Sequence, residues 1–160
     1  LGAKIKLVSA KGERVVALED FFTDYFTTII EPDEILAEIQ LPPPAANTAV
    51  EYMKFATIEA GIKIVSTSVA VTVEAGSDVC KDAKIVMSAV APVPLITKKA
   101  AEMLKGKKLT DDVIEEAAKM AASETDPTTD VHASAEYRKE IVKVLVKRAI
   151  KKAFEKAKKA

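Results

Sequence analysis

Hydrophobic and polar residues alternate over most of the first half of the chain, and this two-residue period predicts β-strands. Residues 3–18 predict a hairpin that turns at Lys11-Gly12. The aromatic stretch 18–26 predicts a short helix or turn. Residues 33–41 predict a further strand. One side of that strand would carry Ile35, Ala37, Ile39 and Leu41. The other side would carry Leu36, Glu38 and Gln40.

Pro42–Pro44 follow this strand and indicate a boundary between two domains. Proline has a fixed φ and no N–H donor, so a strand of a sheet cannot continue through three of them. Alternation resumes at residues 49–55. Two β-branched runs at 63–74 and 81–91 then predict an antiparallel hairpin. The sequence after the prolines therefore predicts a sheet of at least three antiparallel strands.

The last third of the chain has a helical pattern. The predicted helices begin after the capping residues Thr97, Thr110 and Ser134, and Gly106 ends the first of them. The third helix has a continuous apolar stripe at a spacing of four residues. Strands followed by helices predict the α+β class, with a three- to four-stranded antiparallel sheet covered by a layer of three helices.

Composition excludes several kinds of site. Cys80 is the only cysteine and His132 the only histidine, and the five glycines are scattered. An internal disulfide, a phosphate-binding glycine loop and a histidine-based metal site are therefore not expected. We predict no catalytic residue and no metal ligand in this chain. The lone cysteine and the lack of long apolar runs favour a cytoplasmic location and no membrane span.

Charge is balanced, with 24 Lys and Arg against 24 Asp and Glu. Residues 137–160 hold ten Lys or Arg and two Glu, whereas residues 111–130 hold seven Asp or Glu and one Lys. The basic helix has few aromatic residues, which nucleic-acid surfaces use for stacking. We interpret it as a solvated face or as a docking face for a partner subunit, and not as a nucleic-acid site.

Several short strings occur in an order that resembles the FAD-binding (medium) subunit of the molybdenum hydroxylases, the family of carbon monoxide dehydrogenase and xanthine dehydrogenase. These strings are "GERVVALEDFFTDYFTT", "EPDEILAEIQLP", "YMKF", "AVAPVP", "AAEMLKGKKLT" and "DPTTDVHASAEYRKEIVKVLVKRA". The resemblance implies that residues 1–45 end an incomplete FAD-binding domain. It also implies that residues 46–160 form the CO dehydrogenase flavoprotein-like C-terminal domain.

This resemblance implies a role in an oxidoreductase, in which electrons pass from molybdenum through 2Fe–2S clusters to FAD. The implied partners are an upstream FAD-binding half, a 2Fe–2S small subunit and a molybdopterin large subunit, and a homo-oligomer is compatible with them. The chain alone is not expected to hold FAD or to be active, since the glycine-rich pyrophosphate segments are missing. The alternative is a non-catalytic adaptor domain without flavin. The substrate and the electron acceptor stay open.

Three residues are candidates for the flavin site through the resemblance. Leu36, and beside it Ile35, would pack on the isoalloxazine ring, and Lys54 would place its ammonium group near the edge of the flavin. The alternatives are ordinary strand packing for Leu36 and Ile35 and a water-facing lysine for Lys54.

The chain departs from the family pattern in two places, which makes the use of NAD doubtful. Thr57, Ile58, Ala60 and Gly61 stand where an arginine and a Gly-Asp pair are usual, and Ile96 replaces a further arginine.

A "D…S…YR" signature is present at Asp130, Ser134, Tyr137 and Arg138. We interpret it as structural, with Ser134 as the helix cap and Arg138 paired with Asp126 or Asp130.

Overall fold

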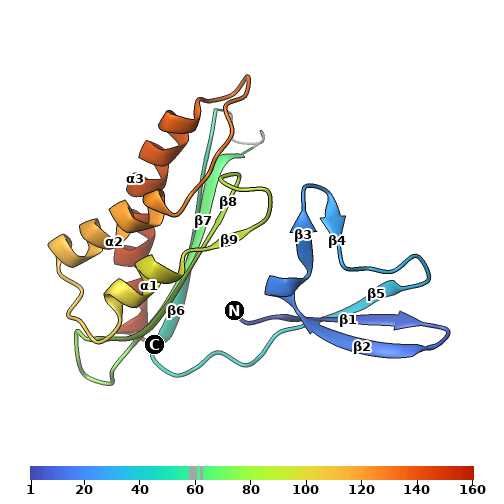
Figure 1. Ribbon diagram of the computed structural model, residues 1–160. Helices are drawn as coiled ribbons and strands as arrows, with labels where there is room; N and C mark the ends of the chain where they lie inside the picture. Colours follow the sequence, from blue (N-terminus) through green and yellow to red (C-terminus); the bar gives the residue numbers. More distant parts are fainter. Residues whose placement is uncertain (58–60, 62) are drawn as a thin grey trace. The chain divides into compact units, whose positions relative to one another are not determined.

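The structure, a computed structural model, describes residues 1–57, 61 and 63–160. The chain divides into two compact units, which we call the N-terminal unit (Leu1–Pro44) and the C-terminal unit (Ala45–Ala160). Both units contain antiparallel sheet, and the three helices belong to the C-terminal unit (Figure 1).

The N-terminal unit consists of two small sheets. One has the strand order β2-β1-β5 and the other is the hairpin β3-β4. The elements are β1 (Lys4–Ser9), β2 (Gly12–Ala17), the 3₁₀ turn η1 (Leu18–Asp20), β3 (Phe22–Asp24), β4 (Thr27–Thr28) and β5 (Ile35–Gln40). The first hairpin turns at residues 10–11, one position earlier than predicted, and Gly12 is already part of β2.

The predicted helix or turn at residues 18–26 is wrong in its second part, where a tight β-hairpin forms. Aromatic and β-branched residues, which favour strands, dominate here over the short helical pattern. Phe26 adopts a positive φ of 52° in the turn. The amide of Ile29 donates to the carbonyl of Phe21 at 3.1 Å, which closes the hairpin onto the small core of Ile5, Leu7 and Phe21.

A bulge changes the predicted sides of β5. Leu36 pairs with Leu7 and Glu38 with Lys6, so the strand holds one extra residue between these pairs. An unpaired extra residue breaks the strict alternation of a strand. Leu36 and Ile39 consequently lie on the same face, opposite Leu7 and Ile5, and their predicted separation onto two sides is wrong.

The C-terminal unit is a four-stranded antiparallel sheet with the order β6-β7-β8-β9, covered on one face by the helices. Its strands are β6 (Thr48–Ala56), β7 (Lys63–Val73), β8 (Cys80–Ser88) and β9 (Leu95–Ile96), and its helices are α1 (Lys98–Leu104), α2 (Asp111–Ser123) and α3 (Ala135–Ala157). The predicted α+β class is confirmed, and so is the helical layer over an antiparallel sheet.

Two of the three predicted helix caps are confirmed. The hydroxyl of Thr110 accepts from the amide of Val113, and that of Ser134 accepts from the amide of Tyr137. Thr97 does not cap α1, because its hydroxyl donates to the carbonyl of Ile85.

The carboxylate of Glu124, at the end of α2, caps α1 instead. It accepts from the amides of Lys99 and Ala100 at 3.3 and 3.0 Å. A tertiary contact thus satisfies two amides at the start of this helix, where intrahelical acceptors are lacking.

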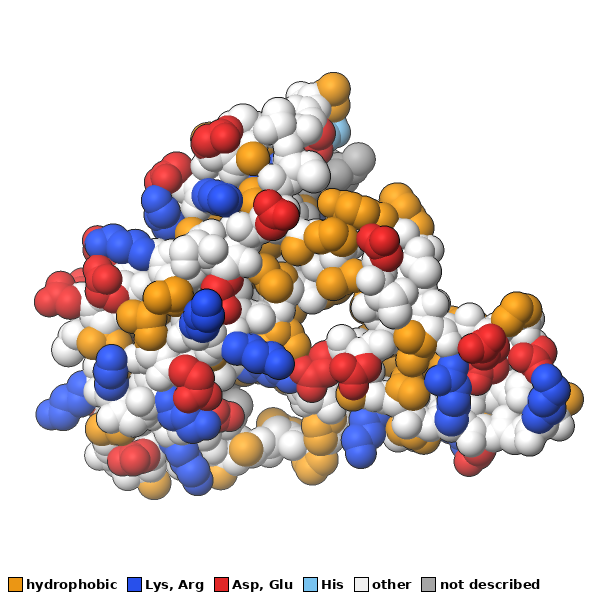
Figure 2. Space-filling view, viewed as in Figure 1, with side chains coloured by type: hydrophobic (Ala, Val, Ile, Leu, Met, Phe, Trp, Pro, Cys, Tyr) orange, Lys and Arg blue, Asp and Glu red, His pale blue; other side chains and the backbone are white. Residues whose placement is uncertain are grey.

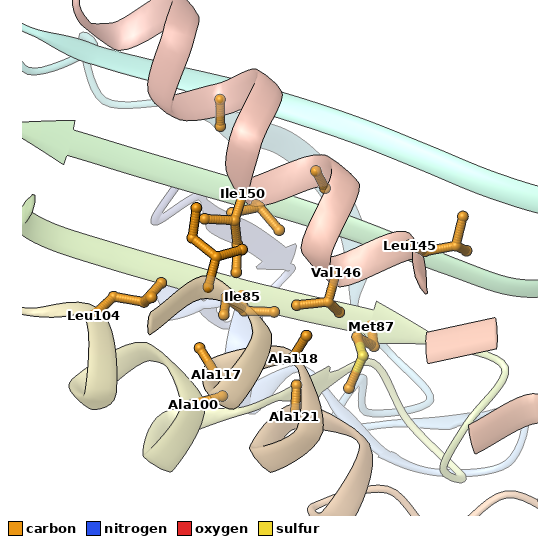
Figure 3. Packing of buried hydrophobic residues seen from close by; sticks show 14 of the residues in the cluster. Ile85, Met87, Ala100, Leu104, Ala117, Ala118, Ala121, Leu145, Val146 and Ile150 are labelled. Atoms are coloured by element: carbon orange, nitrogen blue, oxygen red, sulfur yellow. The ribbon is translucent and has the colours of Figure 1, made fainter. Parts of the chain in front are cut away.

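The main core lies between the sheet and the helices (Figure 3). Alanines on the inner side of α2, such as Ala117 and Ala121, let the helices approach each other and the sheet closely. The sheet contributes alternate residues, among which Val69, Ile85 and Met87 are fully buried.

Side chains of paired residues point to the same face of an antiparallel sheet. The other face, which we call the outer face, is therefore formed by Thr48, Val50, Tyr52, Lys54, Ser66, Ser68, Ala70, Thr72, Asp82, Lys84, Val86 and Ser88.

Acidic and basic side chains are interspersed over the helical layer (Figure 2). Lys147 and Lys151 of α3 form ion pairs with Glu115 and Asp111 of α2 at 2.8 and 2.7 Å. The basic helix is thus partly neutralised by its acidic neighbour. Within the described ranges, no helix has the length and apolar character that crossing a bilayer requires.

Candidate functional site

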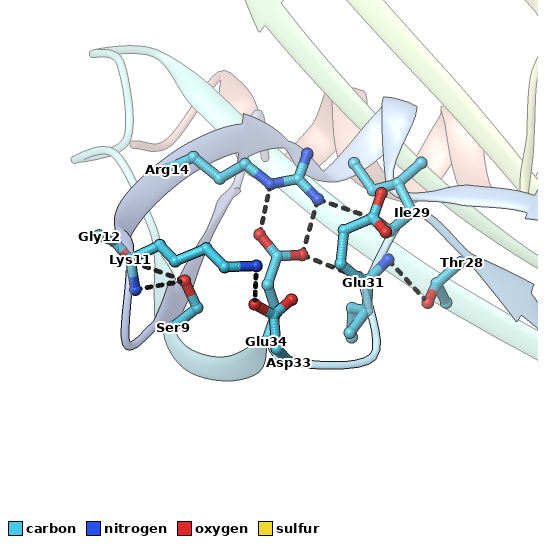
Figure 4. A network of polar contacts seen from close by, with 10 residues as sticks. Ser9, Lys11, Gly12, Arg14, Thr28, Ile29, Glu31, Asp33 and Glu34 are labelled. Carbon is cyan, nitrogen blue, oxygen red and sulfur yellow. Dashed lines mark hydrogen bonds and ion pairs between the residues drawn. The ribbon is translucent and has the colours of Figure 1, made fainter.

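β5 is held in place by a polar network at the point where it begins (Figure 4). Arg14 of β2 donates two hydrogen bonds to the carboxylate of Glu34, at 2.6 and 2.8 Å, and a third to the carbonyl of Ile29. The hydrogen bonds from Arg14, with one from the amide of Glu31, lower the pKa of Glu34 to about 2. Glu34 is therefore ionised at neutral pH and fixes the residue directly before β5.

Ile35 and Leu36 follow this network and present apolar surface on opposite faces of β5. Ile35 is 72% exposed and Leu36 is 37% exposed, although both are large hydrophobic residues. Ile39, on the same face as Leu36, is 63% exposed. An apolar strand surface of this kind can pack against a flat ring or another apolar partner. Sequence reasoning missed Ile39, because the bulge that brings it beside Leu36 has no clear sequence signal.

Lys54 lies on β6 of the C-terminal unit, opposite Ser66 of β7, and belongs to the outer face. Its neighbours along β6, Met53 and Phe55, point to the helical side and pack against the main core. The predicted alternation of β6 is therefore confirmed.

Tyr52 lies two positions before Lys54 on the same face and is half exposed. The Nζ atom of Lys63 is 5.4 Å from the centre of the Tyr52 ring. Partial burial acts to raise the pKa of the Tyr52 phenol. Hydrogen bonds with Lys63 and Ser66, together with the charges of Lys63 and Lys54, outweigh burial, and the pKa is below its ordinary value. Sequence reasoning did not single out Tyr52 or Lys63, although Tyr52 stands within the string "YMKF".

Arg138 has the structural role that the sequence predicted. Its guanidinium pairs with Asp130 at 2.7 Å and donates to the carbonyls of Ile64 and Ala89. Asp130 also accepts from the amides of His132 and Ala133. Through these hydrogen bonds, the buried Arg138 side chain connects the start of α3 to the first residues of β7 and to the residue after β8.

Cys80 is fully buried, and desolvation raises the pKa of its thiol to about 11, so it is a poor nucleophile. Among the residues that the structure describes, no three His, Cys, Asp or Glu side chains come together as a metal site would require.

The departures from the family pattern are only partly visible. Thr57 is exposed and Ile96 lies in β9, paired with Val86, whereas Ile58 and Ala60 are outside the described residues.

The fold defines a class: an α+β unit preceded in the chain by a small β-rich unit. The model of the CO dehydrogenase flavoprotein C-terminal domain matches residues 51–153, and that of the FAD binding domain in molybdopterin dehydrogenase matches residues 1–44. The chain belongs to this family of flavoprotein subunits, and the predicted resemblance is confirmed.

Known proteins show the same relationship. The chain is 31% identical to the carbon monoxide dehydrogenase medium chain of Afipia carboxidovorans, over 86% of this chain and 47% of that one. It is 32% identical to the glyceraldehyde dehydrogenase medium chain of Sulfolobus acidocaldarius, over 88% of this chain and 49% of that one. It therefore spans about half the length of these curated relatives.

Solved structures are also similar. A chain of quinoline 2-oxidoreductase from Pseudomonas putida 86 matches with a TM-score of 0.91 and 26% identity, over 99% of this chain and 54% of that one. A chain of reconstituted CO dehydrogenase from Oligotropha carboxidovorans matches with a TM-score of 0.90 and 30% identity, over 97% and 54%. These relatives are oxidoreductase components, and at the level of the family the predicted cofactor, FAD, is confirmed.

Proposed function

We propose that this chain is the C-terminal part of the flavoprotein subunit of a molybdenum hydroxylase. Residues 1–45 would end the FAD-binding domain, and residues 46–160 would form the C-terminal domain of the subunit. The observation that carries this proposal is the succession of the two family matches, over residues 1–44 and 51–153, along one chain. The names of the relatives, which include medium chains of dehydrogenases, support it.

The exposed residues of the chain fit one part of FAD. Leu36, with Ile39 on the same face of β5, offers an apolar surface for the isoalloxazine ring, whereas Ile35 points to the opposite face. The ammonium group of Lys54 can favour negative charge at the edge of the ring. Bound FAD supplies the acceptance and transfer of electrons. The pyrophosphate needs another partner, because the described glycines with positive φ are far apart in sequence and form no phosphate-binding loop.

The partners follow from this role. Electrons would reach the flavin from molybdenum through 2Fe–2S clusters, and both kinds of centre would lie on other subunits. The chain itself would contribute a wall of the flavin site and a docking surface. Its own side chains would break no bond of the substrate.

Visible spectroscopy tests the proposal. The purified chain alone should contain no stoichiometric flavin, and the chain produced together with the rest of its flavoprotein subunit should bind one FAD. Failure of the combined subunit to take up FAD would favour the alternative, an adaptor domain without flavin. Stoichiometric flavin on the chain alone would contradict the expectation that the pyrophosphate is held elsewhere.

A further inference from the structure

β5 depends on a single neighbouring strand for its position. In the part of the chain that the structure describes, β1 is the only strand that pairs with β5, and all six residues of β5 are exposed. The register also shifts at the bulge between the pairs that Lys6 and Leu7 form. A strand without a buried face has a weakly specified register, and a slip by one residue moves every side chain to the other face. Contacts outside the strand pairing are therefore needed to fix which face carries Leu36.

Arg14 lies on the same face of the sheet as Leu36. Leu7 of β1 pairs with Arg14 of β2 on one side and with Leu36 of β5 on the other. Paired residues of an antiparallel sheet direct their side chains to one face, so these three side chains form a row across the sheet. Leu7, at the centre of the row, is fully buried. Arg14 is thus separated from Leu36 by one strand.

The guanidinium group of Arg14 reaches the segment before β5 (Figure 4). Its Nε and Nη2 atoms donate to the two carboxylate oxygens of Glu34 at 2.6 and 2.8 Å, and Nη2 also donates to the carbonyl of Ile29 at 2.7 Å. The amide of Glu31 donates to the same carboxylate at 2.8 Å. A bidentate bond between guanidinium and carboxylate is geometrically specific. It therefore fixes the position of Glu34, which is two residues before Leu36.

The neighbouring ion pair of Lys11 and Asp33 connects the same segments in a different way. The Nζ atom of Lys11 is 2.8 Å from the carboxylate of Asp33, but the Lys11 side chain is 83% exposed, whereas that of Glu34 is only 11% exposed. An exposed ion pair contributes little, and an ammonium group lacks the rigid planar geometry of a guanidinium. Lys11 is therefore a suitable comparison for Arg14.

We propose that Arg14 is a positioning residue of the flavin site. By holding Glu34 it fixes the register of β5, which keeps Leu36 and Ile39 together on the face that packs against the isoalloxazine ring. This inference rests on the proposed function, in which Leu36 contacts the ring. Arg14 acts through Glu34 and needs no contact with the flavin. With Arg14 in place the apolar face of β5 is ordered before FAD binds, so binding does not have to include the cost of ordering it.

A double-mutant cycle in the complete flavoprotein subunit tests this role. Fluorescence titration of the apo form gives the FAD affinity of the parent, of Arg14→Met, of Leu36→Ala and of the double variant. If Arg14 acts through Leu36, each single substitution should weaken FAD binding about fivefold, and the double variant should bind FAD as tightly as the single variants do. Independent effects would instead multiply to about 25-fold. Lys11→Met is the matched control and should bind FAD like the parent.

Hydrogen exchange in the 160-residue chain without flavin provides a second measurement. Arg14→Met should speed exchange at the amides of β5 that pair with β1, while the β1-β2 hairpin and the C-terminal unit keep the protection of the parent. Protection of the hairpin verifies that the variant is folded. If the hairpin loses protection, Arg14→Lys replaces Arg14→Met in the cycle with the same expectation, because lysine keeps the charge but cannot form the bidentate bond.

The outcomes separate this inference from the proposed function. A parent subunit that binds no FAD would contradict both. If the parent binds FAD, three results overturn the role of Arg14 alone: unchanged affinity in the Arg14 variant, a loss of about 25-fold in the double variant, or an equal loss in Lys11→Met. Equal losses in the two single variants and the double variant, with Lys11→Met unchanged, support it.

Discussion

Replacement of Leu36 by alanine separates a role in packing from a role in flavin binding. Leu36 is 37% exposed, so the free chain already leaves about a third of it in water. Full burial of a leucine side chain contributes about 1.5–3 kcal/mol, and an exposed edge leaves no closed cavity after truncation. We expect Leu36→Ala to lower the free energy of unfolding by about 1 kcal/mol.

Leu104→Ala is the matched comparison, because it makes the same chemical change at a fully buried position in the main core. Loss of buried contact and the remaining cavity should cost about 3–4 kcal/mol there. For the affinity of the complete subunit for FAD, the order of the two substitutions should reverse, with Leu36→Ala having the larger effect. In the complete subunit, covering the exposed third of Leu36 with the ring would contribute about 1 kcal/mol, so Leu36→Ala should weaken FAD binding about fivefold.

Urea unfolding of the chain, followed by circular dichroism, gives the stability of each variant. Fluorescence titration of the apo form of the complete subunit with FAD gives the affinity. The reasoning is refuted if Leu36→Ala destabilises the chain as much as Leu104→Ala does. It is equally refuted if FAD binds the Leu36→Ala subunit as tightly as the parent.

Three further predictions concern charged residues. In the complete subunit, Lys54→Met should lower the reduction potential of bound FAD without releasing the FAD, because no ammonium group would then favour negative charge on the flavin. An unchanged potential in a redox titration would show that Lys54 is not part of the flavin site. Hydrogen bonds from Arg14 lower the pKa of Glu34 to about 2 in the folded chain, against 4.5 as the ordinary value of the carboxyl group. The stability that Glu34 contributes is therefore fully present above pH 4.5 and is lost as the pH falls towards 2. Glu34→Gln should flatten the pH dependence of unfolding in this window, and parallel curves for variant and parent would contradict the ion pair. Arg138→Met should reduce the free energy of unfolding by about 3 kcal/mol through its lost hydrogen bonds. The same change at exposed Arg148 of α3 should alter it by less than about 0.5 kcal/mol, and equal values in urea titrations would contradict the structural role of Arg138.

The hydrophobic pattern of the sequence was sufficient to predict the structure of those elements in which local signals and tertiary packing agree. The alternation in β6 and β7 predicted which side chains share a face, such as Val69, Val71 and Val73. Thr110 and Ser134 predicted the beginnings of α2 and α3. In a strand with one buried and one exposed face, and in an amphipathic helix, the spacing of apolar residues follows the period of the element and shows which face is buried. The flavoprotein family was likewise evident from the order of short strings.

Other features depend on contacts between residues far apart in sequence. The cap of α1 comes from Glu124, although Thr97 stands in the usual place, because the end of α2 reaches the start of α1. The bulge in β5 depends on its pairing with β1, and it alone places Leu36 beside Ile39.

The sequence by itself determined the class of fold, most of the elements and the family. Tertiary structure alone decided which side chains share a surface: the contact of Lys63 with Tyr52 arises from the pairing of β6 with β7, and the position of Arg138 arises from the packing of α3 on the sheet. The physical reason is that spacing fixes the direction of a side chain within its own element, whereas register and packing between elements fix its neighbours.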